Sequence, residues 1–581
     1  MRDVNVAAGT VDIWSNDIVD ARDRYSAQVL ELNPDDIGGL TKIGGGELVL
    51  TGSVDYTGAT RALGGLLTVD GSINRSEISV AETGIIGGIG ALANLTAQEG
   101  GVVAPGNAAN PFGTLTVTGN AVFQPGSYLW VRSAVNGVNY SKLNVGGTAT
   151  LEGGNVIVKA DQGNWNLRTR GMRILTADGG VTGTFDGVTS DLAFLKPTLT
   201  YEDNVVLLSL LRNDVKIASA GKTPNEQAVG GALDVMTSGT STSGNLALED
   251  AVLDGSLEAV SAALPYLTGE AHAALGGVAT ADSRIIRNAM LDRARTGSAS
   301  IVEPVDGRGV YAWATGVFGQ GEYDGSKDYR GFDIQSGGYV VGLDKAFERG
   351  HLGIAFAENK SELRGYDLAT TADVRTRNIG LYAGLNSGAF NFRLGGAWTQ
   401  SDVGTKRNVT LNAFSDQLIG DYEGDGWQAY AEVSWKAEAR GTVFEPYANY
   451  AHVVYDADMK EIGGDAALSG TISEKADLIT AGVRTRTALA GGEGGRPKLT
   501  LVGHLAWTEN VNDDGPVFNA RFADGPVFDV RAASLAGDSL TTGIGLNVEM
   551  NPRAAIDFGY SGNHGSDYTD NRLYGKLTVK F

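Results

Sequence analysis

The sequence of 581 residues contains no cysteine, only 13 prolines and no long apolar run. The absence of cysteine excludes disulfide scaffolds, cysteine-ligated zinc sites and cysteine nucleophiles. No stretch reaches the roughly 18 consecutive apolar residues that a transmembrane helix needs. The N-terminus shows no basic segment followed by an apolar one, so we expect no secretory signal peptide there. The formal net charge of -22 repels phosphate backbones, so no nucleic-acid partner is expected.

Glycine, by contrast, is abundant, with 83 residues, and 42% of the chain is apolar. That apolar fraction is too high for a disordered chain. A composition rich in glycine, threonine and valine is typical of strands joined by tight turns. We therefore expect an all-β protein.

Residues 1–215 contain short alternating strands, each followed by a glycine-containing turn, which recur about every 20–30 residues. Such loose repetition is typical of a solenoid, because a single rung cannot bury its apolar face and stacked rungs share a core. The pattern predicts a β-solenoid. A β-sandwich, which also has closely spaced strands, is the alternative.

Residues 216–300 change to a helical period. Thr223, Pro224 and Glu226 form a capping-box helix start. Around residues 279–295, isoleucine and methionine lie beside four arginines, which predicts an amphipathic helix with a basic face. A basic face is usually exposed to solvent. The helix therefore has two possible places: inside the C-terminal region, or packed outside on the N-terminal region.

Residues 301–581 contain about twelve long strands that mostly alternate apolar and polar positions. The pattern places long connections at 321–330, 405–423, 456–470 and 510–530 and short ones between most other strands. Long and short connections in turn are typical of an up-and-down transmembrane barrel with two different rims. A soluble all-β surface protein is the alternative, since alternation alone does not separate the two.

Aromatic residues and the last strand support the barrel. Trp398, Trp427, Trp435 and Trp507 lie near strand ends on the apolar face, where an interfacial belt is expected. In the last strand, apolar residues through Phe581 alternate with Lys576 and other polar ones. An exposed edge of this kind would aggregate in water, so we expect it to pair with the first strand and close the barrel.

Several sequence segments, in this order along the chain, resemble those of a classical autotransporter, a type V secretion protein. The segments are LTKIGGGELVLTG at Leu40–Gly52, GTLTVTGN, RILTADGGVTGTFDGV at Arg173–Val188, LPYLTGEAHAAL at Leu264–Leu275, YAWATGVFGQ and the terminal Phe581. The resemblance covers nearly the whole chain from about residue 40.

The resemblance implies a right-handed β-solenoid passenger over 1–215, with an autochaperone-like folding segment at 113–211. It implies an α-helical linker over 216–300, a pore helix at 279–295 and a 12-stranded antiparallel transmembrane β-barrel over 301–581. The pore-helix residues would be Arg284, Arg287, Asn288, Arg293 and Arg295. The residues facing the lumen would be Asp344, Arg393, Glu432, Lys436, Glu549 and Asp557. The C-terminal barrel signal would be Tyr574, Leu577, Val579 and Phe581.

The function that this implies is an outer-membrane autotransporter, whose barrel translocates its own passenger and anchors it at the cell surface. Its partners would be outer-membrane lipid and lipopolysaccharide, the barrel-assembly machinery, periplasmic chaperones and a host-cell or matrix ligand. We expect a non-catalytic adhesin or antigen that is not an enzyme and has no cofactor or metal site.

Two other functions stay open. The chain would be the C-terminal part of an autotransporter esterase or protease whose catalytic domain lies upstream of Met1, or a passive outer-membrane porin. Gly537–Leu540 spells GDSL, a lipase nucleophile block, but it opens a barrel strand, so no catalysis is expected from Ser539. Asn288 is a weak candidate for self-cleavage of the pore helix.

Overall fold

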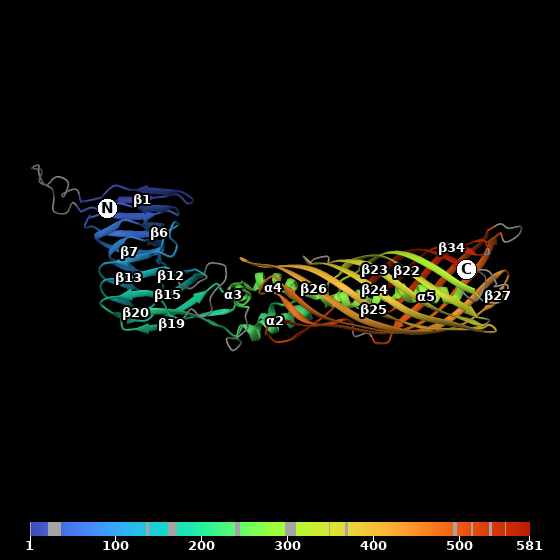
Figure 1. Ribbon diagram of the computed structural model, residues 1–581. Helices are drawn as coiled ribbons and strands as arrows, with labels where there is room; N and C mark the ends of the chain where they lie inside the picture. The colour runs from blue at the N-terminus through green and yellow to red at the C-terminus, as the bar shows by residue number, and fades with distance from the viewer. Residues whose placement is uncertain are drawn as a thin grey trace, which may run out of the picture. The chain divides into compact units, whose positions relative to one another are not determined.

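The computed structural model describes residues 2–20, 37–134, 139–160, 171–238, 245–296, 309–347, 349–365, 370–491, 497–512, 515–533, 537–551 and 553–580. The chain forms two compact units (Figure 1). The first comprises Met1–Val215, Leu246–Val260 and Leu411–Phe414, and the second Lys216–Asn245, Ser261–Thr410 and Ser415–Phe581.

Strands of the N-terminal unit stack in parallel ladders. Strand β10 pairs with β13, β11 with β14 and β12 with β15, and the next three strands continue each ladder. Inward side chains such as Leu115, Leu143 and Val156 are fully buried. Each rung thus covers the apolar face of its neighbour, as expected for a solenoid. The handedness of the coil stays a prediction.

The strands of this unit are β1 (Arg2–Asn5), β2 (Val11–Trp14), β3 (Leu40–Ile43), β4 (Glu47–Leu50), β5 (Ser53–Val54), β6 (Thr60–Val69), β7 (Ser72–Gly88), β8 (Ala91–Ala97), β9 (Val102–Pro105), β10 (Thr114–Val117), β11 (Ala121–Phe123), β12 (Tyr128–Ser133), β13 (Lys142–Val145), β14 (Ala149–Leu151), β15 (Asn155–Ala160), β16 (Met172–Ala177), β17 (Val181–Gly183), β18 (Gly187–Ser190), β19 (Leu195–Glu202) and β20 (Val205–Arg212). The last two form an antiparallel hairpin, and β20 also pairs antiparallel with β16. This hairpin therefore ends the parallel stacking.

A helical segment precedes the barrel. It comprises η1 (Ile217–Ala220), α2 (Pro224–Met236), α3 (Leu246–Asp254), α4 (Leu257–Leu267) and α5 (Glu270–Thr296). The predicted capping box is present. The Thr223 side chain accepts a hydrogen bond from the backbone N–H of Glu226, and the Glu226 side chain accepts one from the backbone N–H of Thr223. Among the residues that the structure describes, no helix is both long and apolar enough to cross a membrane.

Twelve long antiparallel strands close into a barrel, as predicted (Figure 1). The strands of this sheet are β21 (Gly309–Tyr323), β22 (Phe332–Phe347), β23 (Gly350–Gly365), β24 (Thr370–Ser387), β25 (Phe390–Leu411), β26 (Phe414–Trp435), β27 (Ala437–Ala439), β28 (Thr442–Ile462), β29 (Leu468–Ala490), β30 (Lys498–Asn510), β31 (Val517–Phe522), β32 (Phe528–Arg531), β33 (Ser539–Asn551), β34 (Ala554–Gly565) and β35 (Tyr568–Lys580). Strand β21 pairs with β22 on one side and with β35 on the other, so the first and last strands seal the cylinder.

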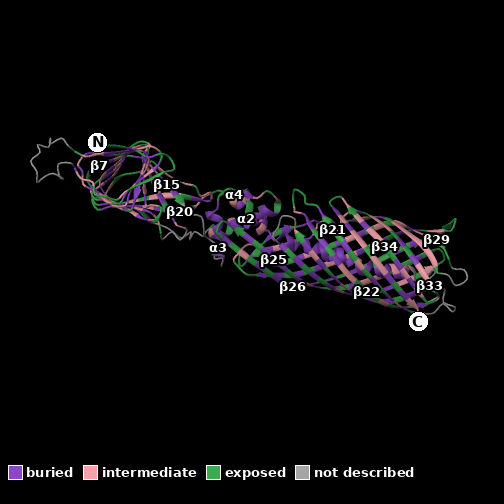
Figure 2. Ribbon diagram, turned by 90° about the horizontal axis from the view of Figure 1, so that it is seen from above, coloured by how far each residue is buried: buried purple, intermediate pink, exposed green. Residues whose placement is uncertain are grey.

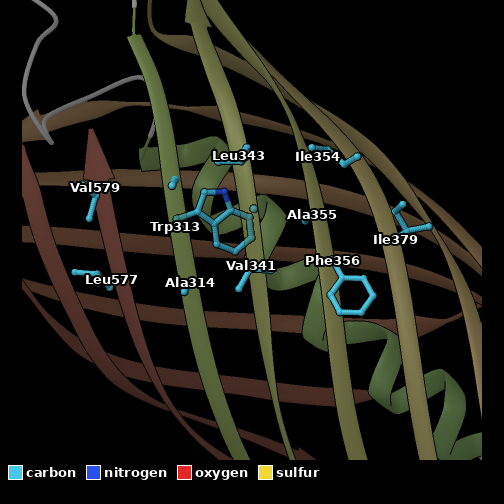
Figure 3. Close-up of a pocket in the computed structure, with 12 residues that line it drawn as sticks. Trp313, Ala314, Val341, Leu343, Ile354, Ala355, Phe356, Ile379, Leu577 and Val579 are labelled. Carbon is cyan, nitrogen blue, oxygen red and sulfur yellow. The ribbon is translucent and has the colours of Figure 1, made fainter. Parts of the chain in front are cut away.

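Residues along the barrel strands alternate between buried and exposed (Figure 2), and many of the exposed ones are large and apolar. Leu352 and Leu381 are 57% and 63% exposed, whereas the interior residues Ala355 and Ala357 are buried. On the outer face, an apolar depression of about 490 Å³ lies across β21, β22, β23 and β35, with Leu343 and Phe356 on its walls (Figure 3). Large apolar side chains on the outside of a closed barrel are those that lipid covers.

The predicted long connection at 405–423 is wrong, because β25 and β26 continue through it and meet at a turn at residues 412–413. Asn412 has a φ of 53° in this turn. The exposed positions there are polar, as at Lys406 and Asn408, so the apolar alternation that marked the other strands is lost although the strand persists.

The long connections predicted at 456–470 and 510–530 are also corrected. In 456–470, β28 continues to Ile462 and β29 begins at Leu468. In 510–530, strands β31 and β32 form a hairpin that pairs with the first residues of β29.

Candidate functional site: the helix inside the barrel

The long helix α5 lies inside the barrel, and nearly all of its described residues are buried or half-buried (Figures 1 and 2). It begins at Glu270, ahead of the segment 279–295 predicted for the pore helix. Gly276 lets the helix approach the wall, since a Cβ there would lie 3.2 Å from Ile472 Cγ2.

One face of α5 is apolar and packs on small wall residues. Ile286 and Met290 are fully buried in a cluster with Ala355 and Ala357. A Cβ on Gly380 would lie 2.7 Å from the sulfur of Met290, so this glycine leaves the space that the methionine fills. The small residues of β23 and β24 therefore form the seat of the helix.

Arg293 makes the strongest polar contact between α5 and the wall. Its Nε and Nη2 donate to the two oxygens of Asp344 at 2.5 and 2.8 Å, and its guanidinium lies 4.5 Å from the ring centre of Tyr311. Tyr382 donates to Asp344 at 3.0 Å and accepts from Trp313 Nε1 at 2.8 Å. A bidentate pair that is this buried and this well hydrogen-bonded fixes the rotation of the helix.

The C-terminal turn of α5 joins a second charged group. Arg295 forms an ion pair with Asp292 and approaches Glu432 at 3.5 Å. Glu432 also binds Arg393 at 2.7 Å and Arg484 at 2.8 Å. Three arginines from the helix and two strands thus converge on one carboxylate.

The middle of α5 contacts β26 and β35. Arg284 binds Asp570 at 3.1 Å. Arg287 donates to Gln428 Oε1 at 2.7 Å, and Gln428 donates back to the backbone oxygen of Ser283 at 2.9 Å. The four arginines named from the sequence therefore all meet the lumen wall.

Not all predicted lumen residues contact the helix. Asp557 pairs with Lys576 at 3.4 Å and Glu549 with Lys498 at 3.7 Å, whereas Arg393 binds Glu432 and Glu445, and Lys436 is half-buried. Tyr574 lines the interior, Leu577 and Val579 line the outer depression, and Phe581 lies outside the described residues. The roles assigned to these residues stay predictions.

A polar cluster at the N-terminal end of α5 escaped the sequence analysis. Buried His272 contacts Glu461 at 2.9 Å and Tyr422 at 3.2 Å, and Arg407 binds Glu461 at 2.5 Å. His272 stands alone in the sequence, and its partners lie in extensions of β26 and β28 that the sequence pattern predicts as loops. Recognising those extensions as strands is the signal that would have found the cluster.

Helix α2 is attached to the same end of the barrel. The Asn225 side chain donates to Arg531 O at 2.8 Å, accepts from Arg531 N at 2.9 Å and donates to Glu270 at 3.0 Å. Glu270 also accepts from the backbone of Arg330 at 2.5 Å. This asparagine therefore ties α2 to both α5 and the β31–β32 hairpin.

A lumen cavity of about 240 Å³ lies along the remaining side of α5. Asn288 lines it and is exposed, and Ser539 lines it on β33. His504, which also lines the cavity, is hydrogen-bonded to Tyr447 at 2.7 Å. Within the described ranges, no cluster of three or more histidine, aspartate or glutamate residues could hold a metal ion.

Comparison with known proteins agrees with this geometry. The family described as the autotransporter beta-domain matches residues 312–561. Two curated relatives, both named extracellular serine protease from Serratia marcescens, are 29% and 27% identical over 98% of this chain. The chain spans 57% of the length of each relative.

Among solved structures, the chain is similar to the translocator domain of autotransporter NalP from Neisseria meningitidis, with 13% identity, a TM-score of 0.41 and coverage of 53% of this chain and 99% of that one. It is also similar to the transport unit of AIDA-I from Escherichia coli, with 13% identity, a TM-score of 0.33 and coverage of 47% and 90%. The C-terminal region, with its closed barrel and internal helix, thus matches the autotransporter β-domain family over residues 312–561, and its place is the outer membrane.

Proposed function

We propose that this barrel translocates the N-terminal unit of its own chain across the outer membrane and then anchors it at the cell surface. The observation that carries the proposal is α5, which lies in the lumen and stands in the sequence between the N-terminal unit and the first barrel strand. An exported N-terminal unit would thereby stay covalently tethered through the pore. Stacking of rungs outside the cell would supply free energy for export, because each rung buries the face of the last. Residues 113–211 would start this folding.

We further propose that the exported part belongs to a secreted serine protease rather than to an adhesin. Both curated relatives are named extracellular serine proteases, and each is longer than this chain. The solenoid would then be the support of a catalytic part that lies outside these 581 residues. This favours the alternative of an autotransporter enzyme over the non-catalytic passenger expected from the sequence.

Surface labelling tests the first proposal. An epitope placed at the exposed turn of Asn107–Asn110 should be labelled by antibody on intact Gram-negative cells. Removing β35 should abolish this labelling, since the barrel then has an open edge. Labelling only after permeabilisation would refute export.

Proteolysis tests the second proposal. The complete gene product should release a casein-degrading activity that a serine-directed inhibitor blocks, whereas the Ser539→Ala variant should keep that activity. A complete gene that encodes no catalytic serine, histidine and aspartate outside residues 1–581 would contradict it.

A further inference from the structure

The lumen cavity beside α5 has more positive than negative side chains. Its lining includes six cations and three carboxylates. The cations are Arg284, Arg287, Arg295, Arg484, Arg572 and Lys576, and the carboxylates are Asp292, Glu432 and Asp570. In a chain whose net charge is -22, this is a local reversal of sign. Such a cavity attracts small anions.

Among the cations of this lining, Arg287 is the one that has no carboxylate partner in the described part of the chain. It is 5% exposed, and its hydrogen bonds go to two neutral groups, Gln428 Oε1 at 2.7 Å and Ser283 Oγ at 3.4 Å. It forms no ion pair with any carboxylate of the described ranges, whereas Arg284 on the same helix binds Asp570. Buried charges in proteins are normally paired, because removing a lone ion from water is costly.

Two further groups in the lining are buried polar donors. Asn449 Nδ2 and Arg484 Nε are buried donors without a hydrogen-bond partner in the described part of the chain, and both residues line the cavity. Asn449 pairs with Glu432, which lies about 13 Å along β26 from Gln428. These donors are thus at another part of the cavity than Gln428. A volume of about 240 Å³ accommodates several waters.

We propose that a small monovalent inorganic anion such as chloride binds in this cavity with the Arg287 guanidinium as its main ligand. The anion supplies the counter-charge that the wall lacks at this level of α5, while Gln428 and Ser283 hold the guanidinium in place. The inference depends on the seat of α5 in the lumen and is independent of any catalytic part of the passenger.

Bromide, which replaces chloride and scatters anomalously, tests the site in the purified full chain. Crystals in sodium bromide should show an anomalous peak beside Arg287 in the wild type. In solution, the thermal midpoint of the barrel should rise with bromide relative to isethionate at equal ionic strength.

Matched variants separate this site from general salt effects. Arg287→Gln should weaken bromide binding about tenfold or more, since a charge-assisted hydrogen bond becomes a neutral one. Arg287→Lys should keep the peak, and so should Arg284→Gln, which alters the arginine that already has a carboxylate. Resistance of the folded barrel to sodium dodecyl sulfate shows that each variant folds. No bromide peak in the wild type, or an equal peak in Arg287→Gln, would overturn the proposal.

Discussion

Each unit contains buried charged residues that form several hydrogen bonds. In the barrel, Arg293 and Asp344 are both almost fully buried and bind through two hydrogen bonds. In the solenoid, Lys42 is fully buried and its Nζ donates to the oxygens of Ile43, Gly44 and Gly64, each at 2.9 Å. None of these three residues is apolar, so replacing one of them leaves its partners without a hydrogen bond rather than simply opening a cavity.

Breaking the Arg293–Asp344 pair should destabilise the barrel strongly. Asp344→Asn leaves a buried guanidinium without its counter-charge, which costs about 3–5 kcal/mol. The double variant Arg293→Met with Asp344→Leu should lose less than the single variant, because no lone charge remains. The thermal midpoint in detergent measures both. Equal losses in the two would show that the pair contributes no specific interaction.

Lys42→Met should destabilise the solenoid by about 1–3 kcal/mol, because three carbonyl oxygens lose their shared donor. Equilibrium urea unfolding followed by tryptophan fluorescence measures the change. The exposed Lys196→Met in the same unit is the control and should alter the unfolding midpoint little.

At the scale of elements, alternation predicted the barrel strands wherever apolar side chains face outward. It identified the interior at Gln428, Glu432 and Asp344 and the pairing of the first strand with the last. It failed in the polar extensions of β25, β26 and β28, because exposed polar residues there resemble a loop. It also could not place His272 or Asn225, whose partners are distant in sequence and meet only when the strands close.

The fit of α5 depends on glycine at position 276. Gly276→Leu should keep the helix from its seat, because the added atoms meet Ile472, Pro516 and Glu474 within 4 Å. Single-channel recordings in planar bilayers should show larger and more frequent openings than in the wild type. Gly231→Leu in α2, where nothing lies within 4 Å of an added Cβ, should leave the recordings unchanged. Identical recordings for both variants would argue against a plug role for α5.

For the whole molecule, the apolar outer band decides where the barrel resides. Leu381, Leu394 and Trp398 lie exposed on the outside, whereas the polar network is enclosed. Lipid replaces water around such a band. The sequence predicted that apolar side chains lie outside and polar ones inside, because the large apolar residues and the charged residues occupy opposite faces of the same strands.

A charge on this band should oppose insertion. Leu381→Arg should destabilise the folded barrel by about 2–4 kcal/mol if the residue lies near the middle of the bilayer. Urea-dependent folding into phosphatidylcholine vesicles measures the change. Thr410→Arg, at an exposed site in the polar extension of β25, should fold as the wild type does.

The seam between β21 and β35 joins the beginning and the end of the barrel sequence. The ribosome makes these two strands more than 250 residues apart, so a nascent or truncated chain without β35 leaves one edge of β21 unpaired. Quality control can therefore detect an incomplete chain by this one unpaired edge. Only a chain translated as far as β35 covers the edge and escapes degradation.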